Sequence, residues 1–188
     1  MREARIGRVL VASLHQAIAD LLPTRLEFYE NWISSVGLRE GTIGLAPLTA
    51  VLSFLRTEGE AYDLITSRAG RYAAEWSLMG VPGWRQTLVR GLPNPLRTWF
   101  ALRMARTLVR ETYAGSRAIV RVRRRNGRVD IRGSIFCQVR EPPAQPLCGY
   151  YAAAIGRILE LFNLPPDARI TRCRAVGARA CAVEVSVG

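Results

Sequence analysis

Four cysteines are the residues of this chain with the most evident chemistry: Cys137, Cys148, Cys173 and Cys181. All of them fall in the last third of the 188 residues. In a protein of the cytosol, such clustering indicates a metal site or buried thiols before it indicates disulfides. Structural zinc prefers thiolate ligands, four of them in a tetrahedron. The alternative is that the four thiols pack in the core as small apolar groups.

Histidine and cofactor motifs offer little further chemistry. His15 is the single histidine, so a site with several histidine ligands is excluded, and any Ser/His/Asp or Cys/His mechanism would have to use it. It lies in a stretch with the apolar spacing of an amphipathic helix, which favours a structural role. The sequence has neither a G-x-G-x-x-G turn after a strand nor a P-loop, and the cysteine spacings differ from ferredoxin-type runs. These features argue against a redox enzyme that works alone.

The elements that must position the cysteines begin with a helical set over residues 1–114. Apolar residues recur at helical spacing over 6–22, 23–36, 47–57 and 60–79, with a short helix or loop over 81–92. A long helix begins at Asn94 and Pro95, a favourable cap and first residue. We expect one face of this helix to point inward and its arginines to point outward. The inner residues are Leu96, Trp99, Phe100, Met104 and Leu108, and the outer ones are Arg103, Arg106 and Arg110.

The character of the chain changes at residue 115. Alternating apolar and polar residues predict strands over 118–122 and 129–135, and Asn126-Gly127 between them is typical of a hairpin turn. A helix over 148–164 and strands over 169–175 and 181–187 follow. The predicted fold is therefore α+β, with an N-terminal helical set followed by a four-stranded antiparallel sheet in β-β-α-β-β order. Residues 1–188 form one domain, in which 115–188 hold the sheet and the cysteines.

The formal charge is +12, and every basic residue is arginine. Codon bias would explain this composition, as would an anionic partner. Arginines gather in the expected hairpin, at Arg117, Arg121, Arg123, Arg124, Arg125, Arg128 and Arg132. No nucleic-acid-binding motif accompanies them, so a solvated hairpin or an acidic partner protein is favoured over nucleic acid. No stretch approaches the roughly 20 apolar residues of a membrane span, and no signal peptide is recognisable, so we expect a cytoplasmic protein.

The C-terminal part resembles the 4-vinyl reductase domain family. The resemblance rests on the stretches PLCGYYAAAIGRILELF and ARITRCRAVGARACAVEVSV. In this pattern one cysteine begins a helix, a second ends a strand and a third follows a glycine turn. These are Cys148, Cys173 and Cys181, with Gly177 in the turn. Residues 69–93 and the segment TYAGS at 112–116 are similar to the bacteriochlorophyll 4-vinyl reductase proteins. The resemblance extends from about residue 58 onward.

The resemblance implies a fold shared with trafficking-complex subunits, a homodimer formed through helices, and a pocket for apolar ligands. In regulatory relatives it also implies a structural zinc bound by three cysteines and a glutamate. Here Ile170 stands at the position of that acidic ligand. Cys137 would replace the missing ligand and complete a Cys₄ site, with Glu184 as a weaker substitute.

The function expected on these grounds is binding of a hydrophobic or aromatic small molecule, such as a tetrapyrrole precursor of bacteriochlorophyll, by a carrier or accessory protein. Such a carrier would hand its ligand to a biosynthetic enzyme. Aromatic residues would line the pocket, and the candidates are Trp76, Trp99, Tyr113, Phe136 and Tyr150. Two alternatives stay open: a vinyl-group reductase or its subunit, and a basic dimeric scaffold for protein partners.

Overall fold

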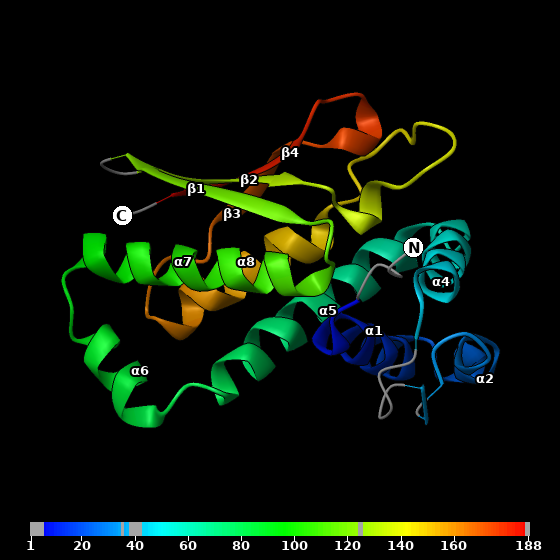
Figure 1. Ribbon diagram of the computed structural model, residues 1–188, viewed down its shortest axis with the longest axis horizontal. Coiled ribbons are helices and arrows are strands. Elements are labelled where there is room, and N and C mark those ends of the chain that lie inside the picture. The colour runs from blue at the N-terminus through cyan, green and yellow to red at the C-terminus, as the bar shows by residue number, and fades with distance from the viewer. Residues whose placement is uncertain (1–5, 35, 38–42, 124–125, 187–188) are drawn as a thin grey trace.

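The computed structural model describes residues 6–34, 36–37, 43–123 and 126–186. It confirms the α+β class, with helices first and a four-stranded antiparallel sheet afterwards (Figure 1). The helices before the sheet are α1 (Arg8–Leu21), α2 (Leu26–Glu30), α4 (Leu45–Thr57), α5 (Glu60–Met79), α6 (Gly83–Arg90) and α7 (Asn94–Thr112). Strands β1 (Arg117–Arg123) and β2 (Asn126–Arg132) precede α8 (Gly149–Leu161), and β3 (Ala168–Arg172) and β4 (Cys181–Ser186) follow it. Short 3-10 turns lie at Pro23–Arg25, Ile135–Cys137 and Arg174–Val176.

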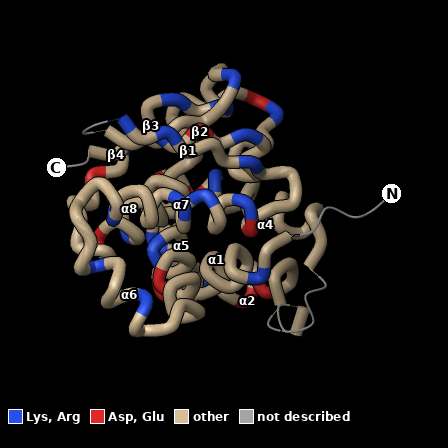
Figure 2. The backbone as a smooth tube through the Cα atoms, turned by 60° about the vertical axis from the view of Figure 1, so that its left-hand side comes forward, with Lys and Arg blue, Asp and Glu red and all other residues tan. Residues whose placement is uncertain are grey.

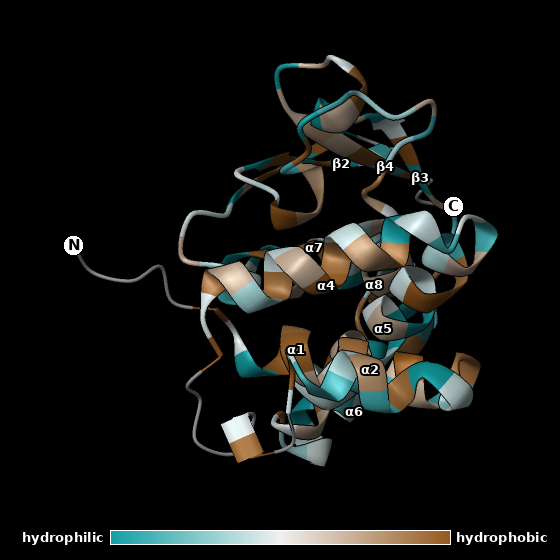
Figure 3. Ribbon diagram, turned by 90° about the vertical axis from the view of Figure 1, so that its right-hand side faces the viewer, coloured by the Kyte–Doolittle hydropathy of each residue, from teal (hydrophilic) through white to brown (hydrophobic). Residues whose placement is uncertain are grey.

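The molecule is layered, with the sheet on one side and two layers of helices beneath it (Figures 1 and 3). The strand order is β1-β2-β4-β3. Val129 pairs with Val183 across β2 and β4, and both side chains are buried. Helices α7 and α8 contact this face of the sheet, α5 packs on α8, and α1 packs on α5. Because side chains alternate along a strand, the opposite face carries Arg121, Arg128 and Glu184.

Helix α5 packs on α8 through small residues, with Ala69 and Ala73 fully buried. A Cβ atom added at Gly70 would lie 2.2 Å from the carbonyl oxygen of Tyr150 in α8. Only glycine allows the two backbones to approach this closely. Leu64 lies on the outer side of α5, where its side chain is 63% exposed.

The orientation predicted for α7 is wrong in its first half. Leu96, Trp99 and Phe100 are exposed, while Leu108 is buried as expected. The buried face consists of Thr98, Ala101, Leu102, Ala105, Leu108, Val109 and Thr112. Small residues at its centre let α7 lie close to β1 and α8, so the bulkiest apolar side chains remain outside.

The prediction that Asn126 and Gly127 form the hairpin turn is wrong, because Asn126 pairs with Arg123 and both Asn126 and Gly127 belong to β2. Arg124 and Arg125, between the two strands, lie outside the described residues. The glycine is needed for packing, because a Cβ atom at Gly127 would lie 2.6 Å from side-chain atoms of α7 and β4.

The second helix is shorter than the sequence predicts. The second helix ends at Glu30 instead of continuing to residue 36. The buried face of α4 consists of Leu48, Val51, Leu52 and Leu55, and that of α8 includes Tyr151, Ile155, Ile158 and Leu159. Within the described ranges, none of the helices has the length and hydropathy needed to cross a bilayer.

Candidate metal centre

The four cysteines come together where the sheet meets the start of α8. Cys137 ends a 3-10 turn, Cys148 directly precedes α8, Cys173 follows β3, and Cys181 begins β4. All four side chains are buried. Their sulfur atoms lie within 4.8 Å of one another. Four segments of the chain therefore meet at a candidate site for one metal ion.

Local backbone structure holds the sulfurs in place. The carbonyl of Cys148 accepts a hydrogen bond of 3.0 Å from the amide of Tyr151, which starts α8 at this cysteine. Gly177 has a φ of 94°, in the left-handed region that favours glycine, and it reverses the chain between β3 and β4. The amide of Ala178 then donates to the carbonyl of Cys173 at 3.2 Å. This turn brings the sulfur atoms of Cys173 and Cys181 within 4.8 Å of each other.

The distances between sulfur atoms fit a single tetrahedral ion. The Sγ of Cys148 lies 3.0 Å from that of Cys181 and 3.1 Å from that of Cys137. The other measured separations are 3.4 and 3.5 Å. Zinc–sulfur bonds of 2.3 Å in a tetrahedron place thiolates about 3.8 Å apart, so a small outward movement would admit the ion. A disulfide needs sulfurs at about 2.05 Å, and the four thiols are free.

Hydrogen bonds among the four thiols shift their pKa values in opposite directions. The bond with Cys148 lowers the pKa of Cys137 to about 7. The bond with Cys137 lowers the pKa of Cys173 and raises the pKa of Cys148 and Cys181. The amide of Arg174 donates to the Sγ of Cys181 at 3.3 Å, which opposes part of this rise in the pKa of Cys181. Metal binding would displace the protons that the cluster still holds.

All four cysteines predicted as metal ligands meet at this point. Cys137, inferred only as a replacement, contacts the other three. Glu184 is not a substitute ligand, because it lies on the outer face of β4 and its carboxylate is 3.6 Å from Arg128. Ile170 pairs with Val183 in the sheet and leaves no acidic group at its position.

Two neighbours of the cluster carry no signal in the sequence. Ser134 is buried with its hydroxyl 3.9 Å from the Sγ of Cys148, and Arg174 contributes only its backbone amide. Each is recognisable only once the chain is folded. His15, set aside as a catalytic group, has its Nε2 2.9 Å from the carboxylate of Glu30.

The five aromatic residues predicted to bind a ligand are not brought together. Phe136 and Tyr150 are fully buried beside the cysteine cluster and stack with ring centres 4.9 Å apart. Trp76 stacks on a neighbouring tyrosine in α5, and Trp99 packs edge-on against a phenylalanine in α7. Tyr113 is half-buried just after α7. None of them lines the hollow beside α4 or the hollow between α6 and α7.

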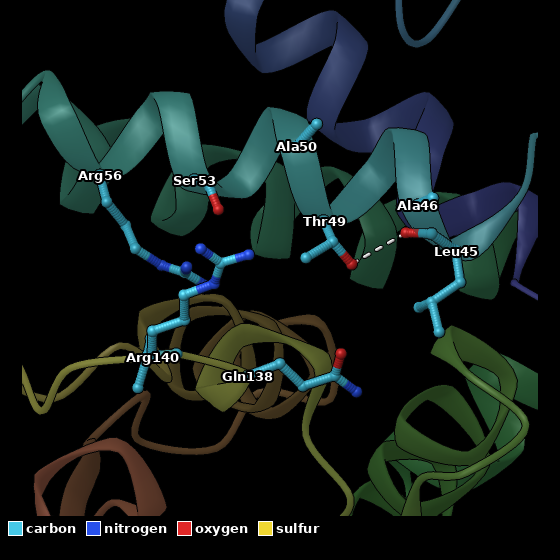
Figure 4. Close-up of a pocket in the computed structure, with 9 residues that line it drawn as sticks. Leu45, Ala46, Thr49, Ala50, Ser53, Arg56, Gln138 and Arg140 are labelled. Carbon is cyan, nitrogen blue, oxygen red and sulfur yellow. Dashed lines mark hydrogen bonds between the residues drawn. The ribbon is translucent and has the colours of Figure 1, made fainter.

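One hollow of about 920 Å³ lies between α4 and the loop that follows Cys137 (Figure 4). Arg56 from α4 and Arg140 from the loop extend into it (Figure 4). The remaining lining is aliphatic or polar, and none of it is aromatic: Leu45, Ala46, Thr49, Ala50, Ser53, Gln138 and Val139. This hollow offers charge and hydrogen bonds but no ring on which a flat ligand would stack.

A second hollow of about 600 Å³, the α6–α7 groove, lies between the end of α5, α6 and α7. Its apolar lining is Val9, Val81, Val89, Phe100, Met104, Leu108 and Phe162. Arg85 and Arg103 also line it, together with Glu111. The groove thus combines aromatic and aliphatic surface with two guanidinium groups.

The two features differ in what they offer chemically. Four thiolates fill every position around a tetrahedral ion, and such closed sites are structural because no position remains for a reacting water. The groove, by contrast, is open to a small molecule. No family model, curated protein or solved structure matches the chain.

Proposed function

We propose that this protein binds a flat, apolar molecule that carries carboxylate groups, and that it holds this molecule in the α6–α7 groove. The observation that carries the proposal is the composition of the groove. Its volume of about 600 Å³ falls in the range of ligand sites. Phe100, which is exposed, supplies aromatic surface, Met104 supplies adaptable apolar surface, and the buried Phe162 and Leu108 reach the groove only at its edge.

The charges of the groove favour a carboxylate on the ligand. Arg85 and Arg103 form no ion pair with any residue in the described part of the chain, so no carboxylate of these residues neutralises either guanidinium group. A planar guanidinium binds a carboxylate through two parallel hydrogen bonds. A tetrapyrrole precursor of bacteriochlorophyll, with its flat ring and carboxylate side chains, has this combination. The resemblance of the cysteine motif to 4-vinyl reductase domains favours the same ligand class and a carrier role.

The cysteine cluster has a separate, structural part in this proposal. Cys137, Cys148, Cys173 and Cys181 would hold one zinc ion, which when bound fixes the loop after β2, the start of α8 and the β3–β4 turn to one another. The residues fit zinc by ligand type, by number and by their mutual distances. The groove is lined by other parts of the chain, so ligand binding is not routed through the ion.

Filling the groove tests the binding site. Thr107 is exposed and lines the groove, and we expect Thr107→Trp to weaken binding of protoporphyrin IX by about tenfold or more, because the indole would occupy apolar surface that the ligand needs. Quenching of intrinsic fluorescence during titration of the whole chain measures the affinity.

Thr57→Trp is the matched control. Thr57 is also an exposed helical threonine whose hydroxyl donates to a carbonyl of its own helix, but it lines neither hollow. Its affinity should stay within about twofold of the parent chain. Equal affinities of the two variants, or no porphyrin binding by the parent, would refute the groove as the site.

A further inference from the structure

The chain between Met79 and Trp99 exposes large apolar side chains at a density that its own fold does not explain. Exposed fractions are 77% for Met79, 65% for Trp84, 60% for Leu88, 49% for Leu96 and 44% for Trp99. No residue of α6 is buried. Figure 1 places α6 at a corner of the molecule, joined to α5 and α7 by short connectors. We call these five side chains the α6 surface.

The segment that carries the α6 surface has charges of one sign, and the nearest acidic residue along α7 is Glu111, which lines the groove with Arg85 and Arg103. Residues 76–110 contain no aspartate or glutamate, and their six arginines are Arg85, Arg90, Arg97, Arg103, Arg106 and Arg110. No ion pair joins any of these arginines to a carboxylate in the described part of the chain. Figure 2 shows basic positions along both α6 and α7. The surface is therefore apolar and cationic together.

Arginine and tryptophan are also paired locally. The guanidinium of Arg85 lies 5.1 Å from the ring centre of Trp84, and that of Arg103 lies 5.3 Å from the ring centre of Trp99. At a bilayer surface, indole rings sit at the boundary between headgroups and acyl chains, while arginine extends its charged end to the phosphates. Short amphipathic helices with this composition lie flat in that boundary.

We propose that the α6 surface binds the surface of a lipid bilayer that contains anionic lipids. A second copy of the chain is a poorer partner, because a twofold contact would set the same unpaired arginines against one another. Single-stranded nucleic acid is also a poorer partner, since it needs ring faces for its bases, and Met79, Leu88 and Leu96 offer none. Anionic lipid satisfies both the aliphatic side chains and the charges.

The proposal extends the function of the groove without depending on it. Arg85 and Arg103 line the groove and belong to the same basic segment, so a ligand dissolved in a bilayer would enter the groove from the bound side. Binding to lipid vesicles needs no porphyrin. Failure of one proposal is therefore distinguishable from failure of the other.

Vesicle sedimentation with the full chain tests this surface. We expect the parent to sediment with vesicles made of equal parts phosphatidylcholine and phosphatidylglycerol, and to remain in solution with phosphatidylcholine alone. The double variant Trp84→Ser with Leu88→Ser should lose affinity by about tenfold or more, because both side chains would leave the apolar boundary. Arg85→Gln with Arg106→Gln should lose about 25-fold, at about fivefold for each arginine near an anionic surface.

Matched controls separate this surface from the general positive charge. Leu64→Ser with Ile119→Ser removes two exposed apolar side chains elsewhere, and Arg117→Gln with Arg123→Gln removes two exposed arginines of β1. Both controls should keep at least half of the parent's vesicle binding. The proposal is overturned if the parent does not sediment with anionic vesicles, or if the controls lose as much as the test variants. It is also overturned if sedimentation velocity detects self-association that Trp84→Ser with Leu88→Ser abolishes and vesicles are not bound.

Discussion

A Cys173→Ser variant is expected to lose its zinc and to melt about 8–16 °C below the parent chain. Structural zinc contributes about 10–16 kcal/mol to small zinc-dependent peptides. If zinc contributes a third of that free energy here, its loss lowers the free energy of unfolding by about 4 kcal/mol. At about 2–4 °C per kcal/mol for a chain of this size, Tm falls by the stated amount. Native mass spectrometry should find one zinc ion per parent chain and none in the variant, and scanning calorimetry measures Tm.

Ser134→Ala serves as the control, because it removes a buried hydroxyl beside the cluster, 3.9 Å from the Sγ of Cys148, and keeps all four ligands. We expect it to retain zinc and to lose about 1 kcal/mol or less. A parent chain that is expressed with ample zinc, carries no metal and melts at the same temperature with and without a chelator would show that the cysteines are buried thiols only.

Gly70→Ala is expected to destabilise the fold by about 3 kcal/mol, because overpacking a close backbone contact forces the structure to shift. The added methyl would lie 2.2 Å from the Tyr150 carbonyl oxygen and 3.0 Å from the Ala154 amide nitrogen. Both are backbone atoms of α8 and have no rotamer through which to move away. The free energy of unfolding in urea measures the loss.

The matched substitution is Gly80→Ala. Gly80 has a φ of −74°, which suits alanine, and the nearest atom to the added Cβ would be 3.8 Å away. This variant should be as stable as the parent or slightly more stable, because alanine restricts the unfolded chain. Comparable losses in the two variants would mean that α5 and α8 are not in the close contact described.

The fold class and the cysteine site could be predicted from the sequence because both depend on local pattern. Alternation in β1 and β2 and helical spacing in α5 and α8 fixed the element types, and four cysteines in one third of the chain left few ways to arrange a site. Cys137 was predicted only because Ile170 occupies the acidic position of the resembled family. Zinc itself, the homodimer and the tetrapyrrole ligand stay predictions.

The face of α7 and the position of the groove could not be predicted in the same way. Hydrophobicity favoured Trp99 and Phe100 as core residues, whereas the helix packs through Ala101 and Ala105, because closeness of backbones decides that contact. The groove joins side chains from α1, α5, α6, α7 and the end of α8, which no local pattern connects. Likewise, the pair Asn126-Gly127 is typical of a turn, and nothing in the sequence indicates the packing role of Gly127. The atoms that Gly127 approaches in α7 and β4 are distant in the sequence.

The four cysteines also set an order of events during synthesis. Cys137 and Cys181 are 44 positions apart, so at about 5–20 residues per second the ribosome needs about 2–9 s between them. For most of this interval the first two thiols lack Cys173, and for all of it they lack Cys181, while the face of α7 that contacts the sheet is incompletely covered. The nascent chain is therefore most exposed to oxidation and to association with other chains just before β4 arrives. Any metal bound at this site would join these segments only after β4 has been synthesised.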